Sequence, residues 1–325
     1  MTPRRFANRY LPERAPAGVL RWTLRRIRDR LPPPPRTPIT GVAAEVAWLR
    51  DNRDTTALTW IGHSSLLLQL DGVNVLVDPV FARFASPVPF AGPRRHQPPG
   101  LAVHELPRVD VVLLSHAHYD HCDVPSLRAV HRQPGGAPTY LVPLGLERWL
   151  ARTLGRDGNG APADVAAFAW DQRATWQGAT DALAFEFLAV QHWSNRTLLD
   201  RNRSLWGSWA ILHPRFRFWY SGDLGYSQDV RDVGARLGRV DLAAIAIGAY
   251  EPRWFMASQH VNPDEAVQVM LDVGADRAIG VHWGTFPLTD EPLDEPPRAL
   301  ERALDARGIP RERFTVMRHG ETRRF

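Results

Sequence analysis

Four side chains that can bind metal ions stand within six positions of this sequence: His116, His118, Asp120 and His121. The whole chain has 12 histidines in 325 residues, so the chance composition of a polar loop explains this cluster poorly. Imidazole nitrogen and carboxylate oxygen are the ligands of catalytic zinc sites. His116 and His118 lie two residues apart and suit one ion on an extended turn. Asp120 and His121 then turn toward a second ion, so the cluster predicts a metal centre.

A centre with two metal ions needs further ligands from distant parts of the chain. Three residues each come just past a short apolar run of the kind that forms a strand: His192, Asp223 and His282. The first cluster has the same placement, because it follows the apolar run 109–114. Loops at strand ends are where folded proteins display functional groups. Each residue alone is more often structural, but the shared placement predicts that all three join the cluster.

The scaffold that must position these residues consists of many short apolar runs. Asp71-Gly72 between the runs 64–70 and 73–77 is a strong hairpin signal. Runs of strands followed by helical patterns predict two sheets packed face to face with helices outside. The other expected strands are 57–61, 109–114, 183–190, 206–212, 216–221, 242–247, 277–281 and 314–317, and the expected helices are 17–31, 124–132, 144–153, 263–273 and 297–307.

The composition bounds the class of protein. Hydrophobic residues make up 44% of the chain, which is enough for a sizeable core and excludes wholesale disorder. All 40 basic residues are arginine and the net charge is +5, but the charge is spread along the chain, which argues against nucleic acid as a partner. Cys122 is the only cysteine and cannot form an intramolecular disulfide, which fits a reducing compartment.

Residues 1–40 form a basic N-terminal extension, which we separate from a catalytic domain at 41–325. Residues 17–31 mix apolar side chains with five arginines and predict an amphipathic helix. Such a helix either lies on an anionic membrane or packs its apolar side on the main body. There is no stretch of 18 apolar residues and no apolar run after the first arginines, so neither a spanning helix nor a signal peptide is expected. We therefore expect a cytoplasmic protein, with peripheral contact to the inner face of the membrane as an option.

The order of motifs, HxHxDH followed by a lone His, a Gly-Asp and a late His, resembles that of the metallo-β-lactamase superfamily. Within it, the chain is similar to the family of N-acyl-phosphatidylethanolamine-hydrolysing phospholipases D and their bacterial relatives, from about residue 6 to the end. Stretches that carry the resemblance include Trp60-Ile-Gly-His63, Leu76-Val-Asp-Pro79, Gln191-His-Trp193, Ile247-Gly-Ala-Tyr-Glu-Pro-Arg-Trp-Phe-Met256, Gln259-His-Val261 and Val281-His-Trp-Gly-Thr-Phe286.

The resemblance implies a four-layer αββα sandwich of two similar halves. It also implies a role for each candidate ligand, and for His260 as a residue that assists catalysis near the metals. By the resemblance, one zinc binds His116, His118 and His192, the other binds Asp120, His121 and His282, and Asp223 bridges both. Asp120 would also orient the attacking hydroxide.

The implied activity is that of a two-zinc phosphodiesterase that releases N-acylethanolamine and phosphatidic acid. The implied partners are a phospholipid substrate, a membrane surface and a second copy of the chain in a homodimer. We expect Tyr119, Trp193 and Phe90 to line an apolar groove for the lipid, although the loop around Phe90 departs from the family pattern. The alternatives are a lactonase, thioesterase or phosphosugar-acting enzyme on the same fold, a nuclease, and a non-catalytic membrane-associated protein.

Overall fold

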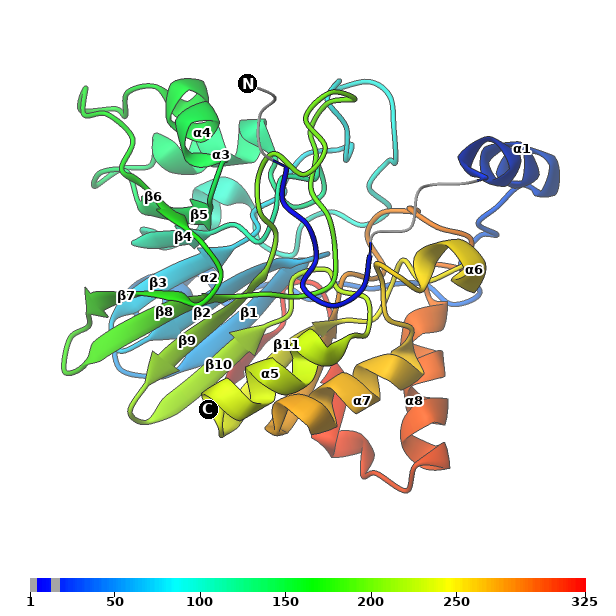
Figure 1. Ribbon diagram of the computed structural model, residues 1–325. Coiled ribbons are helices and arrows are strands. Elements are labelled where there is room, and N and C mark those ends of the chain that lie inside the picture. The colour runs from blue at the N-terminus through cyan, green and yellow to red at the C-terminus, as the bar shows by residue number, and fades with distance from the viewer. Residues whose placement is uncertain (1–4, 13–17) are drawn as a thin grey trace.

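Two seven-stranded sheets form the centre of the computed structural model, which describes residues 5–12 and 18–325 (Figure 1). The first sheet has the order β14-β1-β2-β3-β4-β5-β6. Its strands are antiparallel from β14 to β3 and parallel from β3 to β6. They are β1 (Ala57–Gly62), β2 (Ser65–Leu70), β3 (Val73–Val77), β4 (Val111–Leu113), β5 (Thr139–Pro143), β6 (Val165–Phe168) and β14 (Thr322–Arg324).

The second sheet repeats this pattern in the order β7-β8-β9-β10-β11-β12-β13. Its strands are antiparallel from β7 to β10 and parallel from β10 to β13. The two sheets are therefore similar halves of the molecule. The strands are β7 (Gln172–Gln177), β8 (Ala182–Leu188), β9 (Ser208–His213), β10 (Phe216–Tyr220), β11 (Val240–Ala246), β12 (Ala275–Val281) and β13 (Phe314–Val316).

Helices cover the outer face of each sheet. The first sheet is covered by α2 (Val46–Asp51), α3 (Val124–His131) and α4 (Glu147–Leu154), and the second by α5 (Gln228–Leu237), α7 (Pro263–Val273) and α8 (Glu295–Ala306). The predicted four-layer αββα sandwich is confirmed. Two helices lie outside the layers, α1 (Val19–Asp29) and the four-residue α6 (Arg253–Met256), and 3-10 turns occur at Val103–Glu105 and Arg311–Arg313.

The main core lies between the sheets and is rich in aromatic side chains. Trp60, Phe187, Trp209 and Phe218 are each fully buried there. Burying one such side chain contributes about 1.5–3 kcal/mol to stability. This rigid core fixes the strand ends from which the functional loops emerge.

Several elements were not predicted from the sequence. The strand β7, QRATWQ, is an edge strand with largely exposed side chains, so it has no continuous apolar run. The strand β14 has three residues and exists because Arg324 pairs with Ala57 of β1. The strands β5 and β6 and the helices α2, α5 and α6 were likewise missed.

The N-terminal extension contacts the main body. The backbone N–H of Phe6 donates to the carbonyl of Asn202 at 2.8 Å, and the Asn8 side chain donates to the carbonyl of His192 at 2.9 Å. The division into residues 1–40 and 41–325 stays a prediction. Across residues 5–12 and 18–325, no helix combines the length and apolar character needed to cross a membrane.

Candidate metal centre

The predicted ligands meet at one edge of the sandwich, where several strands end. The cluster 116–121 follows β4, Asp223 follows β10, and His282 follows β12. Since β10, β11 and β12 are parallel neighbours, their carboxyl ends lie at the same edge. His192 arrives from β8 in the same sheet. All seven predicted ligands are thus brought together, in two groups whose donor atoms lie within 4.8 Å of one another.

The first group consists of His116, His118, His192 and Asp223. His116 Nε2 lies 2.8 Å from His118 Nδ1. The Oδ2 atom of Asp223 lies 3.7 Å from His116 Nε2 and 3.8 Å from His192 Nε2. Ligand atoms that each sit about 2.0–2.1 Å from a tetrahedral zinc ion are about 3.4 Å apart, so this spacing suits one ion.

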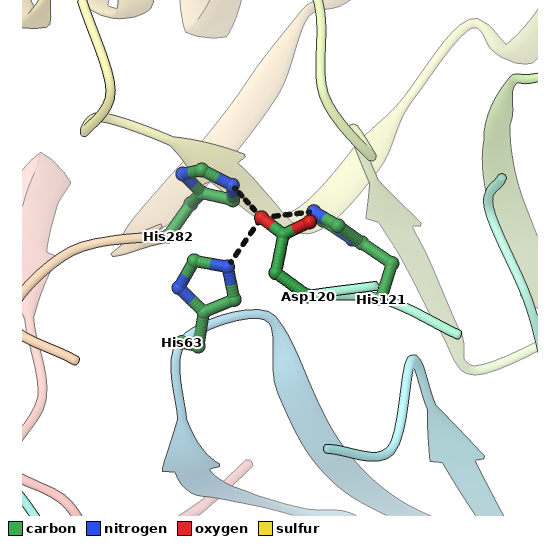
Figure 2. A group of neighbouring side chains, drawn as sticks. All are labelled: His63, Asp120, His121 and His282. Atoms are coloured by element: carbon green, nitrogen blue, oxygen red, sulfur yellow. Dashed lines mark hydrogen bonds and ion pairs between the residues drawn. The ribbon is translucent and has the colours of Figure 1, made fainter. Parts of the chain in front are cut away.

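The second group consists of Asp120, His121, His282 and a residue that we did not predict, His63. Figure 2 shows the three imidazoles pointing at the carboxylate of Asp120. Asp120 Oδ2 lies 3.1 Å from His63 Nε2, 3.4 Å from His282 Nε2 and 3.6 Å from His121 Nε2. The group therefore resembles the first in size and donor chemistry.

Asp223 lies between the two groups. Its Oδ2 atom faces the first group and also lies 3.1 Å from His121 Nε2, while its Oδ1 atom lies 3.3 Å from His282 Nε2. One carboxylate can therefore offer an oxygen to each group, as the predicted bridging role requires.

The donor atoms of the centre fit metal ions. Asp223 lies near the buried Nε2 atoms of His121, His192 and His282, but not with the geometry of a hydrogen bond. These nitrogens and Oδ1 of Asp223 therefore have no hydrogen-bond partner among the described residues. Buried polar atoms without partners are costly and call for an explanation. A cation in each group would satisfy these atoms.

The charge states of the buried side chains also fit bound metal ions. Burial lowers the pKa of His118 to about 3 and that of His192 to about 4, so both are neutral at pH 7, the form that binds metal. Burial also opposes the charge on His282, but the Asp223 and Asp120 carboxylates raise its pKa to about 9. Despite burial, His121 and His282 hold the pKa of Asp223 well below its usual range. Metal cations can replace these protons as the counter-charge of the buried carboxylates.

Hydrogen bonds fix the orientation of three of the histidines. His121 Nδ1 lies 2.8 Å from Asp78 Oδ2, and His192 Nδ1 lies 2.9 Å from the carbonyl oxygen of Gln259. His116 Nδ1 lies 2.9 Å from Ser115 Oγ. Each contact turns the other ring nitrogen, Nε2, toward the centre. Such supporting partners are typical of metal-binding histidines.

His63 was missed because a single histidine between two apolar runs has no distinctive spacing. It occupies the bend between β1 and β2 with a φ of 54°, in the left-handed region that favours glycine. Its backbone N–H donates to Thr285 Oγ1 at 2.8 Å, and its carbonyl accepts from the N–H of His282 at 2.9 Å. Asp78 and His282 also have positive φ, at 39° and 62°. Backbone strain held by its surroundings is a mark of functional sites.

The predicted catalytic residue His260 lies beside the centre. Its ring centroid is 5.2 Å from that of His192 and 5.5 Å from that of His282. Its buried Nδ1 atom has no partner among the described residues. Burial lowers the pKa of His260 well below its ordinary value, so the imidazole is neutral at pH 7.

A pocket of about 670 Å³ opens from the centre, and His118, Asp120, Asp223 and His260 line one part of it. Of the three residues expected to line the groove, Tyr119 and Trp193 do line the pocket. Phe90 does not, and its side chain lies 78% exposed on its loop. The other walls are mostly apolar and come from segments that we did not assign to the site: Trp22, Trp254, Phe255, Met256 and Leu288.

Comparison with known proteins identifies the family. A family model for the β-lactamase superfamily domain matches residues 73–283. The chain belongs to the metallo-β-lactamase superfamily. It is 40% identical over 252 residues to the N-acyl-phosphatidylethanolamine-hydrolysing phospholipase D 1 of Caenorhabditis elegans, covering 77% of this chain and 70% of that protein. A mitochondrial protein of the same name from Saccharomyces cerevisiae is 32% identical over 255 residues, covering 77% of this chain but only 52% of the yeast protein.

A solved structure supports the fold independently. A possible metal-dependent hydrolase from Veillonella parvula matches with a TM-score of 0.65 at 17% identity, covering 84% of this chain and all of that one. The superfamily match and the 40% identity to the nematode enzyme make this chain a metal-dependent hydrolase, in agreement with the two groups of donor atoms.

Proposed function

We propose that this superfamily member is a two-zinc phosphodiesterase of the phospholipase D type. Its substrate would be N-acyl-phosphatidylethanolamine or a related phospholipid, cleaved to phosphatidic acid and an N-acylethanolamine. The observation that carries the proposal is a single pocket in which His118, Asp120 and Asp223 meet walls of tryptophan, phenylalanine and leucine. Such a pocket suits a ligand with a phosphate next to long apolar chains. The similarity to the nematode and yeast proteins supports the choice of lipid.

The two groups of donor atoms would each hold one zinc ion, with Asp223 between them. When bound, the two ions acidify water and offset negative charge on the phosphate. The protein contributes the positions of the groups that surround the phosphorus.

Asp120 and His260 have separate tasks in this proposal. The carboxylate of Asp120, fixed beside His63 and His282, accepts a hydrogen bond from the attacking water and orients it. His260 is neutral, so it donates an N–H hydrogen bond to a phosphoryl oxygen rather than a full proton. The water oxygen bonds to phosphorus as the bond to the ethanolamine oxygen breaks. The proton that the water loses ends on the departing oxygen.

The direct test combines metal analysis with a substrate panel. The full chain, purified with zinc, is assayed on N-acyl-phosphatidylethanolamine, on other phosphodiesters and on lactones, and its metal content is measured by mass spectrometry. We expect two zinc ions per chain and release of N-acylethanolamine. Asp223→Ala is the control, since it removes the ligand that both groups share.

Lactone turnover without phosphodiester turnover would overturn the lipid proposal and leave the metal centre intact. Full activity with one ion per chain would overturn the two-metal proposal. The homodimer and the cytoplasmic location stay predictions that gel filtration with light scattering and cell fractionation can test.

A further inference from the structure

Helix α1 contacts the protein through its polar and aromatic side. Trp22 Nε1 donates to Asp290 Oδ1 at 2.9 Å, and the Trp22 ring lies 5.1 Å from that of Phe255. One turn later, the guanidinium of Arg26 donates to the carbonyl of Leu288 at 2.7 Å. Figure 1 shows α1 outside the sandwich, beside α6. The helix is thus attached to the wall of the pocket.

The opposite side of α1 is apolar and faces away from the protein. Leu20, Leu24 and Ile27 are 73%, 58% and 72% exposed. Their i, i+4, i+7 spacing places them on one stripe of the helix. A surface helix normally buries such a stripe, and an exposed one marks an interaction site.

Arginines flank this stripe. Helical geometry of 3.6 residues per turn places Arg21, Arg25 and Arg28 together along one side of it. All three are exposed, and the single acidic side chain of α1 is Asp29, which lies near Arg25 and Arg28. The exposed side of the helix therefore combines an apolar stripe with net positive charge.

Other exposed apolar side chains belong to the segments that form the mouth of the pocket. Trp254 lines the pocket and is 52% exposed. Leu198 and Leu199, 98% and 75% exposed, lie between the pocket residues Trp193 and Arg201. Exposed apolar side chains therefore occur both on the pocket residue Trp254 and on the loop that connects the pocket residues Trp193 and Arg201.

We propose that α1 docks on an anionic phospholipid bilayer, with Leu20, Leu24 and Ile27 among the lipid chains and the three arginines at the head groups. This docking would set the mouth of the pocket against the lipid surface. An amphipathic helix with basic flanks binds anionic bilayers in two ways. Its apolar side chains are buried among the lipid chains, and its positive charges are attracted to the head groups. A second copy of the chain is a poorer occupant, because a stripe of three side chains is far smaller than the about 800 Å² per partner of a stable interface. The inference rests on the proposed function, because membrane docking serves an enzyme whose lipid substrate must leave a membrane.

The test measures binding without turnover. The full chain is sedimented with vesicles of phosphatidylcholine, alone or mixed with phosphatidylglycerol. We expect binding to the mixed vesicles, weakened about tenfold or more by Leu20→Ser with Leu24→Ser. The matched control is Leu144→Ser with Leu271→Ser, which removes two exposed leucines elsewhere and is expected to bind like the parent.

The charge is tested separately. Arg21→Gln, Arg25→Gln and Arg28→Gln together are expected to lower binding to the mixed vesicles by about fivefold for each arginine. The same changes at Arg132, Arg148 and Arg152, which are exposed on and near α3 and α4, are the control. Unchanged vesicle binding by the variant with all three α1 arginines replaced would overturn the electrostatic part of the proposal.

Unchanged vesicle binding by the double leucine variant would overturn the proposal. So would a change from dimer to monomer in that variant at unchanged vesicle binding, because the stripe would then belong to a second copy. Turnover of a short-chain soluble phosphodiester separates this inference from the proposed function. If the protein binds vesicles through α1 but hydrolyses no phosphodiester, only the proposed function fails.

Discussion

At the floor of the pocket the functional side chains stand at the ends of paired strands, whereas at its mouth they come from short segments outside the two sheets. The floor is the metal centre with its two groups of donor atoms, of which His116 and Asp223 are almost fully buried. The mouth residues Trp22 and Trp254 lie on α1 and α6, and Trp254 is half exposed. Rigid strand ends suit a site that must hold metal ligands to a fraction of an ångström. Attached outer segments suit a pocket mouth that, under the proposed function, admits lipids with different chains.

This contrast predicts that floor variants affect turnover and metal content, while mouth variants affect substrate affinity. Four experiments test this division, and they follow in order of decreasing expected change.

Asp223→Asn is expected to give the largest effect. It keeps the shape of the side chain but removes the charge that both groups of donor atoms share. We expect kcat to fall roughly 10³-fold or more, with a loss of bound metal. Steady-state kinetics and metal analysis check this. A rise in KM at constant kcat would place Asp223 in substrate binding instead.

His63→Gln tests the residue that the structure adds to the floor. The variant loses the imidazole beside Asp120, and we expect activity or metal affinity to fall about 10–100-fold. The matched control is His131→Gln, which changes another buried histidine outside both groups of donor atoms. Equal effects of the two variants on activity would assign His63 a purely structural role.

Trp22→Ala tests the mouth. It removes one wall of the pocket and the hydrogen bond to Asp290. We expect KM for a long-chain lipid to rise about tenfold, because the side chain buries apolar surface of the substrate, with kcat for a small soluble diester unchanged. Trp48→Ala, on α2 and outside the pocket, is the control. A fall in kcat for the small diester would contradict the division between floor and mouth.

The pH dependence of stability should differ between metal-free and metal-loaded protein. Without metal, His118 and His192 have pKa values of about 3 and 4 against an ordinary 6.5, so the unfolded state gains protons first and stability falls as pH drops below about 6.5. His282 has a pKa of about 9, so its contribution is complete below about 6.5 and is lost as pH rises toward 9.

We therefore expect the melting temperature of chelator-treated protein to peak near pH 6.5. Zinc-loaded protein should show a flatter profile, because the ions fix the protonation of these ligands. Thermal unfolding followed by fluorescence across this pH range checks the effect, which is expected to be a few degrees. Identical profiles with and without metal would contradict the assignment of the histidines to metal binding.

The sequence predicted best where the signals are local. The helix α7 has the bounds that were expected, Pro263–Val273, since Asn262 and Glu265 form a capping box and Pro263 occupies the first position. The strands β1, β2 and β3 also agree closely, because their apolar runs are continuous and end at turn residues. The convergence of the seven candidate ligands follows from the same logic, as each comes just past such a run.

Pairing between distant segments decided the rest. The strand β14 becomes a strand only because β1 offers it backbone partners, and His63 becomes part of the centre only because the fold brings it to Asp120. The amphipathic pattern of residues 17–31 was compatible with an apolar side packed on the main body or with one that lies on a membrane. The structure shows that Trp22 and Arg26 provide the attachment, so its leucine stripe is left exposed.

The type of chemistry was therefore evident from the amino-acid sequence, because ligand types and their positions after strands are local properties. Apart from Tyr119 and Trp193, the walls of the pocket became evident only in the folded chain, because they come from segments as far apart as Trp22 and Leu288. Periodicity shows which side of a helix is apolar, but the contacts made by its other side determine where that apolar side points.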